Sequence, residues 1–358
     1  MNFNAVFFKT FRLLLLPVSI IYGLVIYARN FLYDKKIFRS VKFNFPIICV
    51  GNLVMGGTGK STMVEFLVEM LKQEFNVATL SRGYKRRTKG YILASEKTSA
   101  LEIGDEPMQF HVKFPGISVA VCEDRLVAVP QILQDRPATN VIILDDAFQH
   151  RAIDAGLNIL LTQYGDLYTH DFFLPSGDLR DQKVSAERAH MIIVTKCPAD
   201  LSLEEKKLIE KDVHVAEGQT IYFTTLEYGL PYHILTKAEK PLSPEEEVLL
   251  VCGIANPEPL KKYLEENTAA FYQVHFSDHH IYSIDELKGV SKKFEQVQSS
   301  EKIILTTEKD AVRLIKFEKT LMDLPFYVLP VRNRFLFDQE VKFSTAIKQY
   351  ILSYKNQP

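Results

Sequence analysis

A glycine-rich turn near the start of the chain could bind phosphate. Its residues are, in order, Gly56, Gly57, Thr58, Gly59, Lys60, Ser61 and Thr62. A strand-like apolar run, Pro46–Val50, precedes the turn, and an amphipathic helix is predicted to follow from Met63. Glycines let backbone N–H groups converge on an anion, and a helix N-terminus favours negative charge. The turn is therefore predicted to bind a nucleotide, with Lys60 reaching the β- and γ-phosphates and the Ser61 hydroxyl binding Mg²⁺.

The turn departs from the usual GxxxxGK[ST] pattern at its first position, where Val54 stands in place of glycine. Gly56 and Gly57 still supply backbone freedom. The structural alternative is an ordinary glycine-rich turn before a helix. The strand before the turn and the helix after it favour nucleotide binding.

Two adjacent acids supply a second element of such a site. Asp145 and Asp146 directly follow the apolar run Val141–Leu144. In P-loop proteins, a carboxylate at the end of such a strand holds Mg²⁺ directly or through water. A lone apolar run that ends in aspartate is common and weak evidence. Together with a phosphate turn upstream, it becomes strong evidence for a metal-binding carboxylate. The sequence leaves open which carboxylate faces the metal.

A third acid, Asp105, lies in the sequence Gly-Asp-Glu-Pro before a predicted helix through Phe110. Asp105 is typical of a residue that caps a helix. Its carboxylate could also be catalytic if the neighbouring strand ends hold a phosphate. The preceding segment, Arg82–Gly90, has five cations and no acid. It reads equally well as a solvated loop or as a contact for phosphate or anionic lipid.

Alternating strands and helices across residues 46–196 predict a doubly wound, parallel α/β sheet of the P-loop type, with helices on both faces. Met191–Lys196 is expected to be its last parallel strand. Thr220–Leu226 and Tyr232–Leu235 are expected to be strands around Tyr228–Pro231, a bridge to a second, smaller α/β domain that begins near Glu247. The predicted organisation is an N-terminal membrane-associated helix (1–40), a P-loop core (41–225) and a C-terminal α/β domain with bridging strands (226–358).

The apolar run Leu13–Ala28 lies in a basic N-terminal segment. Residues 1–40 carry six basic side chains against one acid, Asp34. Sixteen residues are fewer than the roughly 20 that cross a bilayer as a helix. Aromatic and aliphatic side chains flanked by Lys and Arg are typical of a helix in the membrane interface. The alternative is a terminal helix packed on the protein's own core. If the helix is in the membrane, the flanking basic residues place the rest of the chain on the cytoplasmic side.

The overall composition limits the kinds of partner and the cellular compartment that the sequence predicts. The chain has 358 residues, 47% of them hydrophobic, and a net charge of −1. That balance gives no nucleic-acid signature, and no protein partner is evident from the sequence. The cysteines lie far apart without a CxxC pair, so they read as buried thiols in a reducing compartment. They are Cys49, Cys122, Cys197 and Cys252.

Together, these motifs resemble the tetraacyldisaccharide 4′-kinases of lipid A biosynthesis. The matching stretches, in order, are VGNLVMGGTGKS, TLSRGYKRR, GDEP, EDR, LDDAFQHR, LPSGDLRD, FSDHHIY and TTEKDAVR. They run from about residue 46 to residue 314 and so cover most of the chain. The family pattern has glycine where this chain has Ala147, and often glutamate where it has Asp181.

The resemblance implies a bacterial enzyme on the cytoplasmic face of the inner membrane, peripheral or monotopic, with ATP and Mg²⁺ as cofactors. It implies transfer of the γ-phosphate of ATP to the 4′-hydroxyl of a tetraacyldisaccharide 1-phosphate. Asp105 is then the base, with His279 (or His280) as its partner, and Lys60 stabilises the transferring phosphate. The residues implied to bind substrate are Arg82, Tyr84, Arg125, Gln149, His150 and Arg180.

One alternative is a P-loop GTPase or ATPase of the metallochaperone or regulatory type, without a lipid acceptor. Thr195-Lys196 is similar to the start of the base-reading NKxD motif of GTPases, but the aspartate is missing. Such a protein also predicts a cluster of metal-binding cysteines or histidines, which the wide spacing of the cysteines disfavours.

Overall fold

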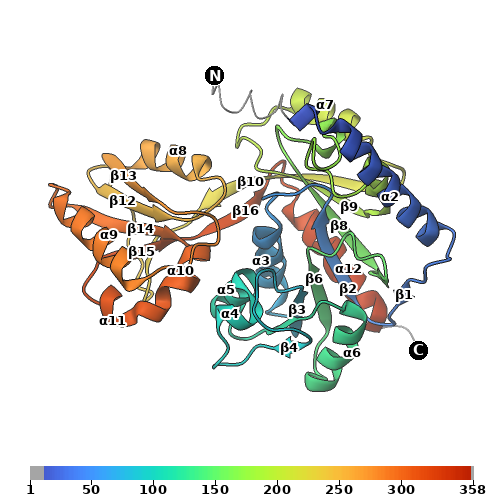
Figure 1. Ribbon diagram of the computed structural model, residues 1–358, viewed down its shortest axis with the longest axis horizontal. Coiled ribbons are helices and arrows are strands. Elements are labelled where there is room, and N and C mark those ends of the chain that lie inside the picture. The colour runs from blue at the N-terminus through green and yellow to red at the C-terminus, as the bar shows by residue number, and fades with distance from the viewer. Residues whose placement is uncertain (1–11, 356–358) are drawn as a thin grey trace.

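The computed structural model describes residues 12–355, so Met1–Phe11, including the basic residue Lys9, lies outside the described residues. Within residues 12–355 the larger sheet has nine strands, in the order β16-β10-β9-β8-β2-β6-β3-β5-β4 (Figure 1). β16 pairs antiparallel with β10 and β4 with β5, whereas the strands between them pair in parallel. The strands are β2 (Ile47–Asn52), β3 (Val77–Ser81), β4 (Ile92–Leu93), β5 (Ser118–Val121), β6 (Val141–Asp145), β8 (Leu157–Gln163), β9 (Met191–Thr195), β10 (Thr220–Tyr228) and β16 (Val331–Phe335).

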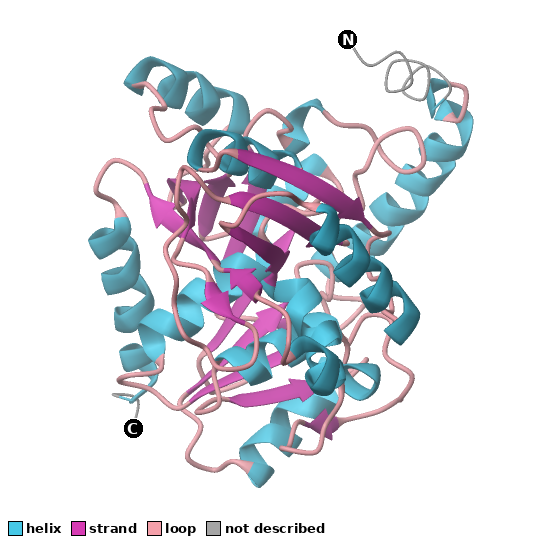
Figure 2. Cartoon of the chain, turned by 90° about the vertical axis from the view of Figure 1, so that its left-hand side faces the viewer, coloured by secondary structure: helices cyan, strands magenta, loops and turns pink. Residues whose placement is uncertain are grey.

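Helices cover both faces of this sheet (Figure 2). Successive residues of β2 and β6 alternate between two apolar clusters, as a strand buried on both faces requires. One cluster includes residues of α3 (Lys60–Leu71), α5 (Asp105–Lys113) and α12 (Glu340–Lys355), and the other includes residues of α6 (Arg125–Asp135) and α7 (Leu203–Val213). The predicted doubly wound α/β fold is confirmed.

The second sheet has five strands among the described residues, in the order β11-β15-β14-β12-β13, with α8 and α9 packed on opposite faces. Its elements are β11 (Tyr232–His233), β12 (Glu247–Cys252), α8 (Glu258–Asn267), β13 (Ala270–His275), α9 (Ile284–Gln296), β14 (Lys302–Thr307), α10 (Glu308–Leu314), α11 (Glu318–Leu321) and β15 (Phe326–Leu329). The remaining short elements are β1 (Val41–Lys42), which pairs with β7 (Ile153–Asp154), α4 (Ala100–Ile103) and the 3₁₀ helices Tyr168–His170, Lys183–Arg188 and Ile315–Phe317.

The prediction that Met191–Lys196 is the last parallel strand is wrong. The first half of β10 pairs in parallel with β9, and its second half pairs antiparallel with β16. The chain thus leaves the larger sheet through β10 and returns through β16. Sheet pairing places β16 with the larger sheet, and α12 packs on that sheet, whereas the sequence-based boundary puts residues 226–358 in one C-terminal unit. The return is fixed by apolar residues of α12, such as Phe343 and Ile347, which are buried in the cluster of α3.

The N-terminal apolar run forms helix α2 (Leu16–Asp34), which lies outside the layers of the larger sheet (Figure 1). It starts at Leu16, later than the run Leu13–Ala28. It also ends later, because the aromatic segment up to Tyr33 continues the helix. By length and composition it is the one helix among residues 12–355 that could cross a membrane. Of its most apolar stretch of 18 residues, 17% is buried. One stripe of the helix packs on the protein, as the second sequence-based alternative predicts, and the rest is exposed; the membrane-interface alternative stays a prediction.

Candidate active site

The glycine-rich turn forms a phosphate cradle between β2 and α3. Gly59 caps α3 in the left-handed conformation, with a φ angle of 84°, and Gly56 has a φ of 110°. Side chains other than glycine rarely adopt such angles, which accounts for these two glycines. Lys60 begins α3, and its Nζ lies 3.5 Å from the Gly56 carbonyl oxygen. The backbone N–H groups in the first turn of an α-helix have no acceptor within the helix, so those of α3 point toward the cradle.

Three side chains outside the turn support the cradle. The Asn52 amide donates to Thr58 Oγ1 over 2.9 Å, and the Thr195 hydroxyl donates to the Thr58 carbonyl over 2.8 Å. The Lys196 ammonium donates to the Gly57 carbonyl over 2.5 Å. Thr195 and Lys196, whose residue types suggested base reading, thus hold the phosphate turn in shape.

Val54 occupies the place of the first motif glycine. It is buried and forms an isolated antiparallel bridge with Leu179. Its φ angle is not among the positive values of the chain, so glycine is not needed there. The departure from the motif therefore leaves the cradle intact.

The two acids at the end of β6 have different environments. Asp145 is buried, and its Oδ1 has no hydrogen-bond partner among the described residues. Burial, followed by the charges of Glu106 and Asp146, raises the pKa of Asp145 to about 8. Glu106, at the start of α5, is therefore near enough to Asp145 for its charge to act on this carboxyl group.

Asp146 is held by cations. Its carboxylate lies 2.7 Å from Arg180 Nη2 and 3.8 Å from Lys60 Nζ. Burial alone raises the pKa of Asp146, but the charge of Lys60 and the hydrogen bonds from Arg180 outweigh it, so the pKa falls below its usual value. Asp146 is therefore an ionised carboxylate within the phosphate site.

Asp105 and His279 meet although they belong to segments packed on different sheets. His279 Nδ1 lies 2.8 Å from Asp105 Oδ2, and the edge of the Tyr84 ring contacts the imidazole with a centroid distance of 5.6 Å. His280 instead pairs with Glu286 over 2.9 Å. The geometry thus distinguishes the two histidines that the sequence left open.

Arg313, on α10, completes this cluster and was missed by the sequence analysis. Its Nη2 lies 2.7 Å from Asp105 Oδ2 and 3.1 Å from His279 Nδ1. Burial alone raises the pKa of Asp105, but hydrogen bonds from His279 and Arg313 dominate and hold it well below its usual range. Lys309, with Nζ 3.3 Å from His279 Nε2, adds a second cation. Both cations lie in the TTEKDAVR stretch, which was noticed as a motif but not for its charges.

A buried ion-pair network joins the cradle helix to the second sheet. Lys113 Nζ, on α5, lies 2.9 Å from Glu65 of α3 and 2.7 Å from Glu308 of α10. Gln109 also donates to Glu65, over 2.6 Å. The network fixes α5, which carries Asp105 at its start, against both the cradle and α10.

The residues implied to bind substrate have varied environments. Arg180 is engaged with Asp146 and with the Asn52 side-chain oxygen. Gln149 donates to the Asn52 carbonyl, and Arg125 is buried and donates to the Glu123 carbonyl over 3.2 Å. The structure therefore gives these three side chains partners within the protein.

Arg82, Tyr84 and His150 are the more available of the implied substrate residues. Arg82 and Tyr84 are exposed on the loop after β3. His150 Nε2 is buried without a hydrogen-bond partner among the described residues. Burial, with the charge of Arg125, lowers the pKa of His150.

The chain matches a known family over most of its length. The family model described as "Tetraacyldisaccharide-1-P 4'-kinase" (LpxK) matches residues 11–352. A relative from Flavobacterium johnsoniae named "Tetraacyldisaccharide 4'-kinase" is 43% identical over 344 residues, covering 95% of this chain and 97% of the relative. A relative of the same name from Phocaeicola vulgatus is 41% identical over 347 residues, covering 94% of each chain.

A solved structure agrees with these relatives. The crystal structure of LpxK from Aquifex aeolicus, an "apo" form in complex with ATP, superposes with a TM-score of 0.75 at 30% identity. The match covers 95% of this chain and 99% of that one. The resemblance drawn from the motifs is confirmed, and the chain belongs to the tetraacyldisaccharide-1-phosphate 4′-kinase family.

Proposed function

We propose that this protein transfers the γ-phosphate of ATP to the 4′-hydroxyl of a tetraacyldisaccharide 1-phosphate, a step of lipid A biosynthesis. Family membership supports the reaction, and the ATP complex of the Aquifex aeolicus relative supports the nucleotide. The observation that carries the proposal is the contact of Asp105 with His279, which provides an acceptor-activating pair at the start of α5, the helix that Gln109 and Lys113 join to the cradle helix α3.

Nucleotide binding is assigned to the cradle. The proposed nucleotide-binding residues are Gly56, Gly57, Thr58, Gly59, Lys60, Ser61 and Thr62. The N-terminus of α3 and the Lys60 ammonium together favour the β- and γ-phosphates. Lys60 then neutralises charge as the phosphoryl group moves, which is most of the catalysis in such a loose transition state.

The residues at the cradle fit a Mg²⁺ ion. Asp145 Oδ1 is a buried carboxylate oxygen without a partner among residues 12–355, and its raised pKa reflects uncompensated burial. Oxygen atoms of carboxylates and hydroxyls are the ligands that Mg²⁺ prefers. We assign the ion to Asp145 and Ser61, with the ionised Asp146 adding charge nearby. Bound there, Mg²⁺ would neutralise charge on the phosphate oxygens.

Asp105 is assigned as the base. Its Oδ2 is engaged by Arg313 and His279, and no hydrogen bond to Oδ1 is found among the described residues, so Oδ1 can accept the acceptor hydroxyl. The lowered pKa of Asp105 makes it a weak proton acceptor early in the reaction. In a loose transition state the hydroxyl loses its proton late, so the first role of Asp105 is to orient the oxygen. His279 contacts Oδ2 and stabilises the negative charge of the Asp105 carboxylate.

Substrate binding is assigned to exposed or unpartnered groups, two of which lie on the loop next to this cluster. Arg82 and Tyr84 stand on the loop that reaches His279, and His150 Nε2 is free to bond a ligand. Arg125 and Arg180 add positive charge from within the protein, and Gln149 shapes the wall through the Asn52 carbonyl. A phosphorylated sugar is the kind of ligand that such a cationic wall attracts.

Helix α2 is assigned to the cytoplasmic face of the inner membrane. Ile20, Ile21, Leu24 and Val25 point outward and are between 61% and 64% exposed, whereas the buried residues of α2 are Ser19, Gly23 and Asn30. A helix on a water-exposed surface shows the opposite pattern. An apolar outer face suits a lipid interface, where this enzyme meets its lipid substrate.

The proposed function is tested by incubating the protein with γ-labelled ATP, Mg²⁺ and a monophosphorylated tetraacyldisaccharide. Transfer of label to the lipid, giving a bisphosphorylated product, is the expected result. Release of labelled inorganic phosphate at the same rate with and without the lipid contradicts the proposal. For the membrane assignment, the Ile20→Asp, Leu24→Asp double variant is expected to remain in solution when anionic vesicles are pelleted, whereas the unmodified protein pellets with them.

A further inference from the structure

The face of α2 that contacts the protein is polar, which a simple apolar anchor does not require. Ser19 Oγ donates to Ser176 Oγ over 2.8 Å and accepts from the Ser176 N–H over 3.0 Å. Asn30 Nδ2 donates to Asp181 Oδ1 over 2.6 Å. Ser19, Ser176, Asn30 and Asp181 are all buried. Polar groups this buried stabilise a specific geometry because leaving either partner unpaired is costly.

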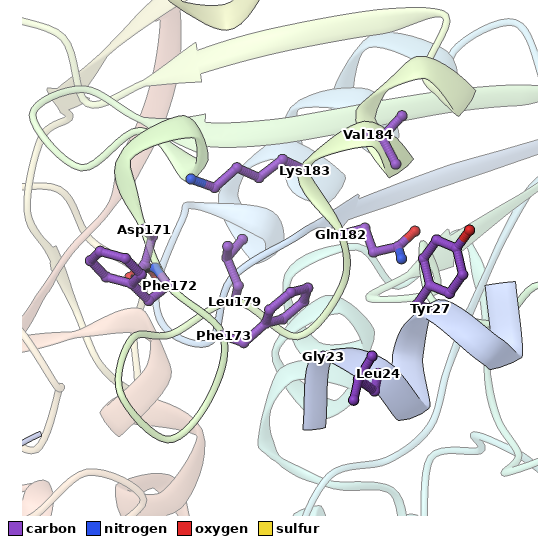
Figure 3. A pocket seen from close by; sticks show the side chains of 10 residues that line it. All are labelled: Gly23, Leu24, Tyr27, Asp171, Phe172, Phe173, Leu179, Gln182, Lys183 and Val184. Carbon is purple, nitrogen blue, oxygen red and sulfur yellow. Dashed lines mark hydrogen bonds between the residues drawn. The ribbon is translucent and has the colours of Figure 1, made fainter. Parts of the chain in front are cut away.

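These contacts converge on one segment, residues 173–182. Tyr22 donates to the Arg180 carbonyl over 3.2 Å, and Arg12 donates to the Pro175 carbonyl over 3.0 Å. Phe173 of the segment lies against Gly23 of α2, as Figure 3 shows, and an added Cβ at Gly23 would come within 2.9 Å of the Phe173 ring. The segment is therefore attached to α2 along its length.

The other side of the same segment contacts the phosphate cradle. The Arg180 N–H donates to the Leu53 carbonyl, and the Met55 N–H donates to the Asp178 carbonyl, each over 2.7 Å. The Arg180 guanidinium then reaches Asp146. The segment is thus bonded to α2 on one side and to the entrance of the cradle on the other.

A second route joins α2 to the cradle and meets the first at Asn52, whose side-chain oxygen accepts from Arg180. Arg29 Nη2 donates to the Gln149 carbonyl over 2.7 Å, and Gln149 Nε2 donates to the Asn52 carbonyl over 2.6 Å. Asn52 in turn donates to Thr58 within the cradle. Both routes start on the inner face of α2 and end at groups that contact the phosphate turn.

We propose that α2, besides docking on a membrane, is a positioning element for Arg180 and the phosphate cradle, acting mainly through the buried Asn30–Asp181 hydrogen bond. Asp181 is fully buried, and it also accepts from Ser185 and Arg188. Loss of Asn30 removes one donor from that carboxylate and loosens the residue next to Arg180. The kinetic part of this inference rests on the proposed kinase function, whereas the structural part does not.

The structural part is tested by hydrogen exchange of the Met55 and Arg180 amides in the full-length protein. Asn30→Ala is expected to accelerate their exchange, since the loss of one hydrogen bond to a buried carboxylate changes an opening equilibrium by roughly tenfold. Asn267→Ala is the matched control because its amide bonds only the Tyr263 carbonyl of its own helix. Faster exchange confined to α2, with unchanged Met55 and Arg180 amides, overturns the proposal.

The kinetic part is tested by a double-mutant cycle. Asn30→Ala is expected to lower kcat with detergent-dispersed substrate by about tenfold in the wild-type background and to have little further effect in Arg180→Met, because the two changes act on one interaction. An equal loss in both backgrounds contradicts the proposal. Binding to anionic vesicles is measured in parallel, and a loss of activity that follows loss of vesicle binding would mean that α2 is only an anchor.

One further variant and the independence of the exchange assay keep the outcomes distinct. If Asn30→Ala fails to fold, Ser19→Ala tests the same segment through Ser176 with a smaller side-chain change. If the wild-type protein transfers no phosphate to lipid, the proposed function fails, while the exchange of the Met55 and Arg180 amides still decides the positioning role.

Discussion

The phosphate cradle and the Asp105–His279–Arg313 cluster form one candidate site, but the chain assembles them differently. The cradle comes from the contiguous segment between β2 and α3, supported by neighbouring strands of the same sheet. The cluster takes Asp105 from the start of a helix on the larger sheet and the two other residues from segments of the smaller sheet.

This difference predicts different sensitivities. The cradle depends on local backbone conformation, which one strand, one turn and one helix determine. The cluster depends on how the two sheets pack, and therefore on the interface of α3, α5 and α10. Variants in the cradle should abolish phosphoryl transfer directly, whereas variants around the cluster should change the pH dependence or the stability of the assembly.

The largest effect is expected for Lys60→Ala. Loss of the ammonium removes charge neutralisation at the transferring phosphate, so kcat should fall by roughly 10³-fold or more. The variant should keep its thermal unfolding midpoint. Lys72→Ala is the control at the far end of the same helix, where Lys72 is the C-cap residue and pairs with Glu69, and it should retain wild-type kcat. Near-normal turnover of Lys60→Ala contradicts the assignment of the cradle.

Asp105→Asn should have the next largest effect. The amide keeps an oxygen for Arg313 but cannot take a proton, so kcat should fall by roughly 10²-fold or more while the KM for ATP stays near its wild-type value. His280→Gln is the control, because His280 pairs with Glu286 outside the cluster. A parallel loss of ATP affinity in Asp105→Asn would indicate that this acid is a structural helix cap.

The glycine-rich turn between β2 and α3 and the acids at the end of β6 could be predicted because their signals are local. A strand, a glycine turn and a helix are adjacent in sequence, and two positions with positive φ explain the glycines at residues 56 and 59. The family motifs also named Asp105 and His279 as partners. Sequence position alone could not predict that these two side chains are in contact, because they are 174 residues apart.

Other features depended on packing that no local pattern records. Arg313 and Lys309 stood in a noticed motif, but their contacts with His279 arise only when α10 packs on α5. Likewise, the return of β16 and α12 to the larger sheet follows from burial of apolar groups such as Phe343 against α3. The polar inner face of α2 was hidden because its serine, glycine and asparagine are few among many apolar residues.

Arg313→Met should move the pH profile of kcat. In the wild type, hydrogen bonds and the charge of Arg313 hold the pKa of Asp105 low, so Asp105 stays ionised well into the acid range. Without that cation, burial raises the pKa, and the acid limb of the profile should shift to higher pH. Arg313→Lys, which keeps a positive charge, should show a smaller shift of the acid limb than Arg313→Met. A uniform loss of kcat at all pH values would mean that Arg313 only stabilises the fold.

The smallest effect concerns the network that ties the cradle helix to the smaller sheet. Burial, then the charge of Glu308, raises the pKa of Glu65 to about 7. A folded-state pKa above the ordinary value means that protonated Glu65 favours the fold, so this contribution is present in acid and lost as the pH rises through about 7. Glu65→Gln cannot ionise and still accepts from Gln109 or Lys113. Its free energy of unfolding should therefore fall less than that of the wild type between about pH 5 and about pH 8.

Urea unfolding at the two pH values measures this difference, and Glu69→Gln, an exposed acid on the same helix, is the control. A wild-type slope in Glu65→Gln would mean that Lys113 already compensates both carboxylates. The cradle and the cluster would then be joined by a balanced ion network, and pH would affect the site through the catalytic groups alone. A reduced slope instead shows that ionisation of one buried carboxylate on α3 weakens the interface on which the contact of Asp105 with His279 depends.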